Sequence, residues 1–434
     1  MNEYTLAGII GTFFLIAIFF TRMAVAYAMA FVGFLGCWYL SGLRPALSML
    51  SNIIYGQFTS YGLALIPMFI FMGFIAFYGG VSTRLYDMAY KFLGSIRGGM
   101  AMATVVACTA FGAVCGSTTA TAATMGTIGI PEMKKYNYSN RLATGCVAAG
   151  GGLGILMPPS VVLIIYGILT QLSIGSLFIA GIIPAFLITF LFILAITIYC
   201  TIFPEEGPKG KRFTWKEMLF SVTEIWETLL VFLLVIGGMF LGIFTPTKAG
   251  AIGSFLLLII TIFQKKLDWE KFKKAVSDTV KTSCMIIMLV TGASIFGNFL
   301  ALTRIPINVA NMISELPWPG WAIMGIICFI YLIGGCFIDA LALITLTIPI
   351  FYPIVTNIGY DPIWFGVIIV LVTQMGIITP PVGINAYIVK GIAKDVPLGE
   401  IFIGCMPFLI ALIVGTGIII AFPEIATFLP NVIK

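Results

Sequence analysis

The chain has 434 residues, of which 60% are hydrophobic and 9% are charged, and its formal net charge is +6. This balance excludes a soluble protein and is typical of a polytopic α-helical membrane protein. The chain has no His, which excludes His-ligated metal sites and His proton relays. The nine Cys are scattered through apolar segments without a CxxC pair, so we interpret them as buried thiols.

Ten apolar runs are long enough to predict helices that cross a membrane. They cover residues 5–21, 24–43, 61–80, 143–170, 176–203, 225–244, 248–264, 282–302, 363–389 and 401–422. Glu3 stands where a signal peptide would carry Lys or Arg, and no small-residue cleavage site follows the first run. We therefore expect the first run to be retained as a span.

Two further segments are too long for one span of about 20 residues. Residues 99–131 carry no charge and are rich in Gly, Ala, Ser and Thr, whereas residues 319–356 are interrupted by Gly334, Gly335 and Asp339. Each segment predicts a re-entrant hairpin of two half-helices with a polar tip. The amphipathic stretches 84–97 and 265–281 predict arm helices in the membrane interface.

The Lys and Arg residues predict the orientation, because they are enriched in cytoplasmic loops. With the N-terminus outside, 19 of the 23 fall on the cytoplasmic side and four (Arg44, Lys248, Arg304 and Lys434) fall outside. Arg22 is among the 19. Basic residues in short loops beside apolar spans favour membrane lipid over nucleic acid as a partner, and the Lys-rich segment 265–274 is expected to face anionic lipid.

The same phrase occurs in both halves of the chain, as Gly154-Ile-Leu-Met-Pro-Pro-Ser160 and as Gly376-Ile-Ile-Thr-Pro-Pro-Val-Gly383. A Pro-Pro pair within an apolar run must break the helix, and the freed carbonyls need partners other than lipid. Hairpin and broken span follow in the same order in each half, from opposite sides of the membrane. The pattern predicts an all-α transporter fold with an inverted repeat.

We divide the chain accordingly into five parts. Residues 1–60 form N-terminal scaffold spans, 61–203 the first repeat, 204–264 a linker with scaffold spans, 265–422 the second repeat and 423–434 a tail.

Two polar features mark the predicted ion and substrate sites. The first is the hairpin segment 115–124, which has five hydroxyl side chains beside the first break. The second is Asp339, the acidic residue deep in an apolar run, which we pair with Gly335 and with the segment 373–379. Hydroxyl and carbonyl oxygens suit Na⁺, and half-helix N-termini suit an anion. Packing by small residues and a structural hydrogen bond of Asp339 are the alternative interpretations.

The order of a small-residue hairpin, the phrase at residues 152–160, a second hairpin and the phrase at residues 376–385 resembles the large membrane subunit of tripartite ATP-independent periplasmic (TRAP) transporters. The resemblance covers nearly the whole chain and implies Na⁺-driven uptake of an organic acid, sialic acid and C4-dicarboxylates among them, by an elevator motion. It implies two partners, a small four-helix membrane subunit and a periplasmic substrate-binding protein. The implied location is the bacterial inner membrane.

The resemblance implies about two Na⁺ sites. They fall on Ser117, Gly154, Met157 and Pro158 in the first half, and on Gly335, Thr373, Gly376 and Thr379 in the second, where we add Asp339. Substrate contacts are expected from Thr118, Thr119, Ser160, Pro380 and Asn385. The first tip is expected to contribute more to the substrate, because the second has Cys336-Phe-Ile-Asp339 in place of hydroxyls.

Three alternatives remain at this point. A stand-alone Na⁺/dicarboxylate symporter would share the fold and work without a binding protein. A passive channel needs no matched pair of hairpins. An intramembrane enzyme needs catalytic groups, but the chain has no His, no HExxH motif and no second acidic residue to pair with Asp339, so we expect no enzyme.

Overall fold

The computed structural model describes residues 3–19, 23–308 and 318–432, and those residues form helices without a strand. Arg22 and Lys434, which entered the orientation prediction, lie outside the described residues. The first half contains α1 (Glu3–Phe19), α2 (Val25–Ser41), α3 (Leu43–Phe58), η1 (Tyr61–Ala64), α4 (Leu65–Tyr78), α5 (Val81–Leu93), α6 (Gly99–Cys115), α7 (Thr118–Lys135), α8 (Asn140–Gly152), η2 (Leu153–Ile155), α9 (Val161–Thr170) and α10 (Ile174–Ile202). The second contains α11 (Trp215–Thr223), α12 (Trp226–Phe240), α13 (Pro246–Phe263), α14 (Trp269–Thr303), α16 (Gly320–Phe337), α17 (Ala340–Asn357), α18 (Pro362–Gly376), α19 (Ile384–Ile392), α20 (Leu398–Ala421) and α21 (Glu424–Val432).

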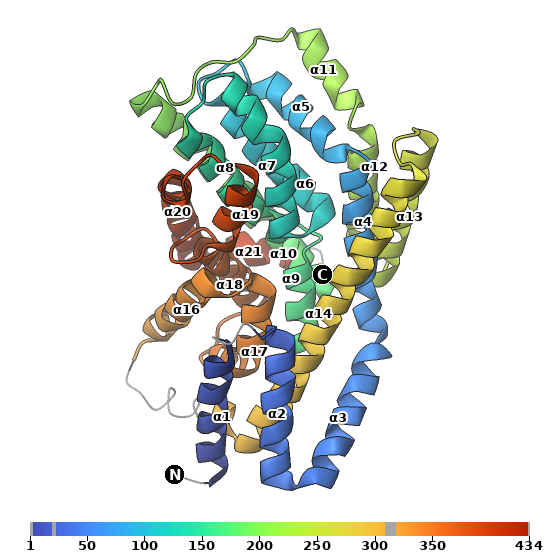
Figure 1. The fold of residues 1–434 in the computed structure, drawn as a ribbon, viewed down its shortest axis with the longest axis vertical. Helices are drawn as coiled ribbons and strands as arrows, with labels where there is room; N and C mark the ends of the chain where they lie inside the picture. The colour runs from blue at the N-terminus through green and yellow to red at the C-terminus, as the bar shows by residue number, and fades with distance from the viewer. Residues whose placement is uncertain (1–2, 20–22, 309–317, 433–434) are drawn as a thin grey trace.

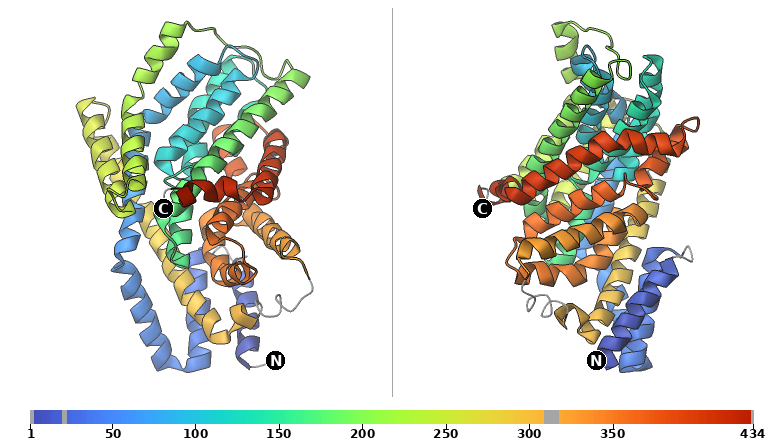
Figure 2. Two further views of the ribbon diagram at one scale, coloured as in Figure 1. Left: turned by 180° about the vertical axis from the view of Figure 1, so that it is seen from behind. Right: turned by 90° about the vertical axis from the view of Figure 1, so that its left-hand side faces the viewer.

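The helices form two groups side by side (Figure 1). One group contains α2, α4, α13 and α14, with α14 packed against both α2 and α4. The other contains the hairpin helices, the broken helices, α10 and α20, with α8 packed against α7 and α20. The views in Figure 2 show the long helix α14 running beside the second group. We call the first group the outer helices and the second the hairpin group.

Both predicted hairpins are present. α6 and α7 meet at Gly116 and Ser117, and α16 and α17 meet at Ile338 and Asp339. The first tip is shorter than expected, because α7 already begins at Thr118. Most hydroxyls of the segment 115–124 therefore lie on the first turns of a helix.

Both Pro-Pro phrases break their helices, as predicted. The first break separates α8 from α9 and the second separates α18 from α19. Each break has lost regular helical hydrogen bonding over several residues, since proline supplies no backbone N–H.

Other boundaries differ from the predictions. The basic stretch 265–281 and the span 282–302 are parts of one 35-residue helix, α14, because nothing between them interrupts the helix. Three further helices, α3, α11 and α21, were not predicted. Seven helices of the described residues are long and apolar enough to cross a membrane, or eight if α11 and α12, bent by 53°, count as one span. Two of the seven, α16 and α17, lie where half-helices of a re-entrant hairpin were predicted, so each is longer than expected. By contrast α9 and α18, within predicted spans, have fewer than 18 residues.

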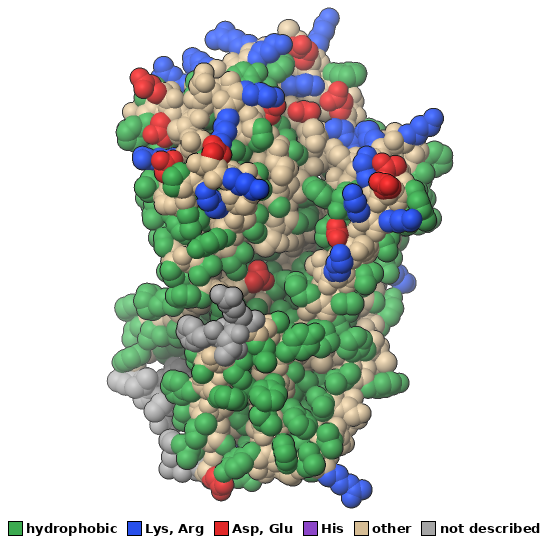
Figure 3. All heavy atoms as spheres, viewed as in Figure 1, with side chains coloured by type: hydrophobic (Ala, Val, Ile, Leu, Met, Phe, Trp, Pro, Cys, Tyr) green, Lys and Arg blue, Asp and Glu red, His purple; other side chains and the backbone are tan. Residues whose placement is uncertain are grey.

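Lys and Arg side chains gather at one end of the molecule, over α5, α7 and α11 and the adjoining ends of α13 and α14 (Figure 3). The N-terminus lies at the opposite end (Figure 1). A belt of hydrophobic side chains separates the two ends (Figure 3). This asymmetry agrees with the predicted external N-terminus.

A buried ion pair joins α5 to α12 at the basic end. Arg84 pairs with Glu227, whose side chain is 1% exposed. Arg84 Nη1 also donates to the carbonyl oxygen of Glu224 at 3.3 Å. The pair therefore fixes α5 against the bend between α11 and α12.

Removing one partner of this pair is expected to destabilise the protein. Glu227→Ala leaves Arg84 as an uncompensated buried charge, which costs about 3–5 kcal/mol. Glu132→Ala is the matched control, because Glu132 forms an exposed pair with Lys135, which is worth about 0–1 kcal/mol. Thermal unfolding in detergent measures both variants; equal melting temperatures would contradict the expected difference.

Candidate substrate and ion site

The tip of the first hairpin rests on the first helix break. Gly116 ends α6 with φ +65, and a Cβ at this position would lie 2.3 Å from the Pro159 carbonyl oxygen. Val161 N donates to the Gly116 carbonyl at 3.4 Å. Only glycine permits this backbone conformation and this close approach together.

Ser117 caps the N-terminus of α7. Its hydroxyl oxygen accepts from Ala120 N at 3.4 Å and lies 3.2 Å from Thr119 Oγ1. The positive end of the α7 dipole and its free N–H groups therefore lie at the tip, which favours a negatively charged group there.

Oxygen atoms of this tip lie against the first break. A Cβ on Gly154 would lie 2.7 Å from the Ser117 carbonyl oxygen and 2.6 Å from Thr121 Oγ1. Within the described residues, no donor reaches the carbonyl oxygens of Met157 and Pro158. Ser117, Gly154, Met157 and Pro158, the predicted first Na⁺ site, thus lie along one tip-to-break contact, where oxygen atoms of the kind that Na⁺ prefers are free.

Ser160 is placed differently from its predicted role. Its hydroxyl donates to the Ile155 carbonyl at 2.5 Å and accepts from Leu163 N at 3.2 Å. These two bonds close the break and cap α9. The side chain is fully buried, so its hydroxyl serves the backbone.

The second hairpin tip rests on the second break in the same manner. Gly383 N donates to the Cys336 carbonyl at 3.2 Å. A Cβ on Gly376 would lie 2.5 Å from the Gly335 carbonyl carbon, and one on Gly335 would lie 3.1 Å from the Thr373 carbonyl oxygen. Gly335, Thr373 and Gly376 are therefore brought together through their backbones.

The hydroxyls of the second break are already committed as donors. Thr373 Oγ1 donates to the Ile369 carbonyl at 2.6 Å, and Thr379 Oγ1 donates to the Met375 carbonyl at 2.7 Å. Their oxygen lone pairs face no donor in the described part of the chain. The carbonyl oxygens of Thr373 and Gly376 already accept from Ile377 N and Thr379 N. A cation would therefore use the second lone pair of these carbonyls together with the hydroxyl oxygens.

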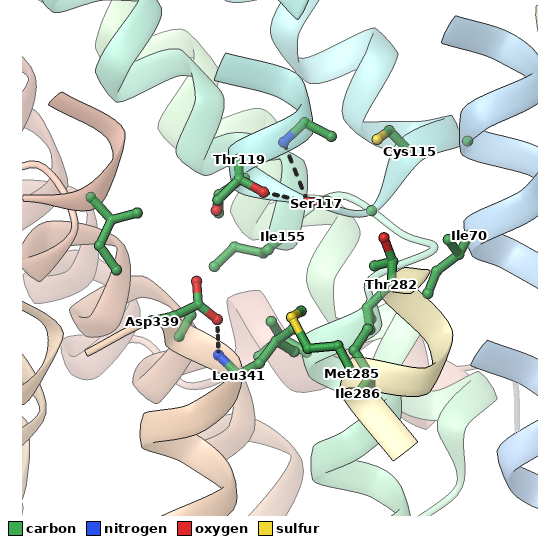
Figure 4. A pocket seen from close by; sticks show the side chains of 18 of the residues that line it. Ile70, Cys115, Ser117, Thr119, Ile155, Thr282, Met285, Ile286, Asp339 and Leu341 are labelled. Carbon is green, nitrogen blue, oxygen red and sulfur yellow. Dashed lines mark hydrogen bonds between the residues drawn. The ribbon is translucent and has the colours of Figure 1, made fainter. Parts of the chain in front are cut away.

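Asp339 caps α17 at the second tip. Its carboxylate oxygen Oδ2 accepts from Leu341 N at 3.0 Å. Figure 4 shows this carboxylate facing the first tip across a cavity. The carboxylate therefore caps α17 and also faces the cavity.

A cavity of about 620 Å³ separates the two tips from the outer helices. Ser117, Thr118, Thr119 and Asp339 line it from the hairpin group, as Figure 4 shows for the labelled members. α14 contributes residues that the sequence did not single out, namely Thr282, Met285, Ile286 and Leu289. Asp339 is the one charged residue among those that line it. Gly335, Thr373, Gly376, Thr379, Pro380 and Asn385 are not among the residues that line it.

Two buried amides lie where the two broken helices cross. Asn385 Nδ2 donates to the Ala148 carbonyl on α8 at 3.0 Å, which ties the second break to the first broken helix. A Cβ on Gly152 would lie 2.5 Å from Gln374 Cγ, so Gln374 packs on α8 as well. Neither amide atom of Gln374 has a protein partner, nor does Asn385 Oδ1. Such atoms need water or an ion.

At the basic end of the molecule, a salt bridge joins the end of α7 in the first half to the segment after α19 in the second half. Lys134 Nζ, at the end of α7, donates to Asp395 Oδ2 at 2.5 Å, and Asp395 follows α19. This hydrogen bond lowers the pKa of the Asp395 carboxyl below its ordinary value.

The comparison with known proteins now identifies the family. Residues 12–425 match the family model described as the tripartite ATP-independent periplasmic transporter, DctM component. The chain belongs to the DctM family. The family resemblance inferred from the two Pro-Pro phrases is therefore confirmed.

Curated DctM relatives carry different substrate names. A C4-dicarboxylate TRAP transporter large permease of Pseudomonas aeruginosa is 34% identical over 86% of this chain and 86% of its own length. A sialic acid TRAP transporter large permease of Vibrio cholerae is 30% identical over 96% of each chain. An isethionate TRAP permease of Oleidesulfovibrio alaskensis, named DctMQ, is 35% identical over 86% of this chain and 59% of its own length.

A solved structure supports the fold alone. The YdaH transporter of Alcanivorax borkumensis superposes with a TM-score of 0.65 at 14% identity, over 89% of this chain and 90% of that one. The chain is therefore a membrane protein of the DctM transporter family that is helical over its described residues, and the three relatives quoted above are named as transporter permeases.

Proposed function

We propose that this chain is the large subunit of a Na⁺-coupled importer of an organic anion. One observation carries the proposal: each hairpin tip rests on a helix break that has free carbonyl oxygens, and the two tips face one cavity. Na⁺ bound at each contact would hold tip and break together. The anion would then bind to a site that Na⁺ has organised.

The first tip supplies the contacts for the anion. The cavity has no Lys or Arg side chain in its lining, so the carboxylate of a substrate must take its donors from elsewhere. The N-terminus of α7 offers backbone N–H groups with the hydroxyls of Thr118 and Thr119 beside them. A helix N-terminus binds an anion without a buried cation.

Asp339 is the proposed cation ligand on the opposite side. An unpaired carboxylate facing a substrate anion would repel it unless a cation lies between them. The described residues contain no group of three Cys, Asp or Glu side chains that could together coordinate a divalent metal ion. A single carboxylate on a wall that also carries hydroxyl side chains fits a monovalent cation better.

Alternating access follows from the arrangement of the two helix groups. We propose that the two halves are inverted repeats and that the hairpin group moves as a body past the outer helices, in an elevator motion. The cavity lies between the two groups, so substrate on the hairpin tips would travel with them. A small membrane subunit and a periplasmic binding protein complete the proposed system, and the bacterial inner membrane is its proposed location.

Uptake into proteoliposomes tests this function. With the small subunit and the loaded binding protein present, an inward Na⁺ gradient is expected to drive uptake, and K⁺ in its place is not. Transport without the binding protein would favour a stand-alone symporter. Uptake that ignores the Na⁺ gradient, or current without substrate, would overturn the coupling proposed here.

A further inference from the structure

A second cavity of about 620 Å³ lies at the basic end of the molecule, away from the hairpin tips. It is formed by three segments: the turn between α5 and α6, the last turns of α10, and the linker after α10. The lining residues are Ser95, Ile96, Arg97, Met102, Thr197, Thr201, Lys209 and Arg212. Three positive charges therefore meet in one hollow, and no negative charge lines it.

Hydrogen bonds hold the linker against α5 and the turn that follows α5. Gly98 N donates to the Gly207 carbonyl at 2.9 Å, and Gly210 N donates to the Gly94 carbonyl at 2.8 Å. Lys211 N donates to the Tyr90 hydroxyl at 3.3 Å. The linker that carries Lys209 and Arg212 is thus held against the turn that carries Arg97. The cations are brought together by the fold and are not merely loose ends of neighbouring loops.

The three cations have no carboxylate partner among the described residues. None of them forms an ion pair, whereas four other Lys residues and Arg84 do. Glu206, on the same linker, accepts hydrogen bonds from Ser139 Oγ at 2.9 Å and from the Tyr199 hydroxyl. Like charges gathered without a partner repel one another, and an anion in the hollow would relieve this.

An exposed apolar column leads up α10 to the cavity. Five residues at four-residue spacing are exposed by 42–63%, namely Phe186, Phe190, Leu194, Ile198 and Ile202. Each step of four residues advances about 6 Å and turns about 40° around the helix, so the row winds over about 24 Å and only neighbouring members share a face. The three members nearest the cavity, Leu194, Ile198 and Ile202, form the stretch that adjoins it. Ile198 and Ile202 directly follow Thr197 and Thr201, and these two threonines line the cavity. A molecule with a long apolar part and an anionic head would fill both features.

We propose that this site binds the phosphate headgroup of an anionic phospholipid, with an acyl chain along the α10 column. The positive-inside rule explains why cytoplasmic loops are rich in Lys and Arg. It does not explain why three of these cations line one cavity on segments that hydrogen bonds hold together. Arg97, Lys209 and Arg212 are exposed, as are Lys273 and Lys274 on α14, so the distinguishing feature of the site is the backbone bonding of the linker to the turn after α5. Since the site joins α10 to the linker, bound lipid would brace the hairpin group at its connection to α11.

Lipid binding to the delipidated, full-length chain in detergent tests the proposal. Phosphatidylglycerol and phosphatidylcholine with the same acyl chains are titrated, and bound lipid is counted by native mass spectrometry. Phosphatidylglycerol is expected to bind with at least tenfold higher affinity. Inorganic phosphate and glycerol 3-phosphate are titrated in parallel as competitors, and displacement at equal concentration would identify a free phosphate site and overturn the lipid proposal.

The variant series uses Arg97→Gln, Lys209→Gln and Arg212→Gln, singly and together. Each charge near an anionic lipid is worth about a fivefold change in affinity, so the triple variant is expected to lose about 100-fold. The control is the triple variant Lys216→Gln, Lys274→Gln, Lys281→Gln, which removes the same charge outside the cavity. If both triple variants lose the same affinity for phosphatidylglycerol, or if the cavity variant loses none, the proposed lipid site is wrong. If the triple variant cannot be purified, the single variants decide.

Discussion

Replacing Gly376 with alanine is expected to abolish Na⁺-driven uptake, with a loss of about 50-fold or more. The new Cβ would lie 2.5 Å from the carbonyl carbon of Gly335 and 2.8 Å from the Leu332 carbonyl oxygen, both backbone atoms of α16. Backbone cannot rotate away, so the second hairpin must move off the break. Overpacking of this kind costs about 1–3 kcal/mol, which corresponds to a loss of up to about 150-fold in binding.

Gly391→Ala is the matched control for Gly376→Ala. Gly391 lies on α19, in the same broken helix, and a Cβ there would meet no atom within 4 Å. This variant is expected to transport normally. Gly154→Ala, which crowds the Ser117 carbonyl oxygen in the first half, is expected to resemble Gly376→Ala.

A thermal-shift titration with NaCl separates loss of the ion site from loss of the fold. Wild type and Gly391→Ala are expected to gain stability with Na⁺ relative to K⁺. Gly376→Ala is expected to remain folded but to lose part of this gain, because one tip-to-break contact persists. Normal uptake by Gly376→Ala would show that close approach of tip and break is not needed for transport.

Replacing Asp339 with asparagine is expected to reduce uptake by about 10- to 100-fold while leaving the fold intact. Asparagine caps a helix nearly as well as aspartate, so the bond to Leu341 N survives. What disappears is the negative charge on the cavity wall. Hydrogen bonds and contacts to a charged group are worth about 1.5–3 kcal/mol, which sets the expected range.

Asp361→Asn provides the control, since Asp361 also caps a helix. Its Oδ1 accepts from Ile363 N at 2.7 Å and from Trp364 N at 3.0 Å at the start of α18, away from the cavity. Both variants are expected to melt within a few degrees of wild type. If Asp339→Asn carries substrate at the wild-type rate, the carboxylate serves only as a cap and the cation role is wrong.

We expect the cavity, and not the ion sites, to determine which organic acid the protein selects. Relatives within the family are named for a dicarboxylate, a sulfonate and a sialic acid. The cavity wall here offers one carboxylate, a few hydroxyls and a helix N-terminus, with apolar side chains over the rest. Selection among acids must then depend on how α2, α4 and α14 close over the tips.

The sequence alone predicted the hairpins and the breaks, because their causes are local. Pro158-Pro159 and Pro380-Pro381 cannot continue a helix in any environment. Ser117 and Asp339 mark the tips because both residue types favour helix N-caps. The family followed from the same residues, since two such phrases in one apolar chain are rare.

The boundary within α14 was wrong for an equally local reason. Charge falls sharply after Lys281, and the pattern there indicated a basic arm followed by a span. No Pro or Gly separates the two parts, so the helix continues from Trp269 to Thr303. A change in hydropathy indicates where a helix enters the membrane, but a helix ends only where residues such as Pro or Gly interrupt its backbone hydrogen bonding.

Only the tertiary structure decided which oxygens are free and which residues share a cavity. The hydroxyl of Ser160 was predicted for substrate, but folding brings it within reach of the Ile155 carbonyl, which it bonds. Thr282 and Met285 carry no motif, yet packing of α14 beside the hairpin tips places them on the cavity wall. Helix breaks are determined by covalent structure and can be read along the chain. Cavities arise from contacts between segments far apart in the chain, such as those that carry Ser117, Thr282 and Asp339, and the sequence of any one segment does not contain them.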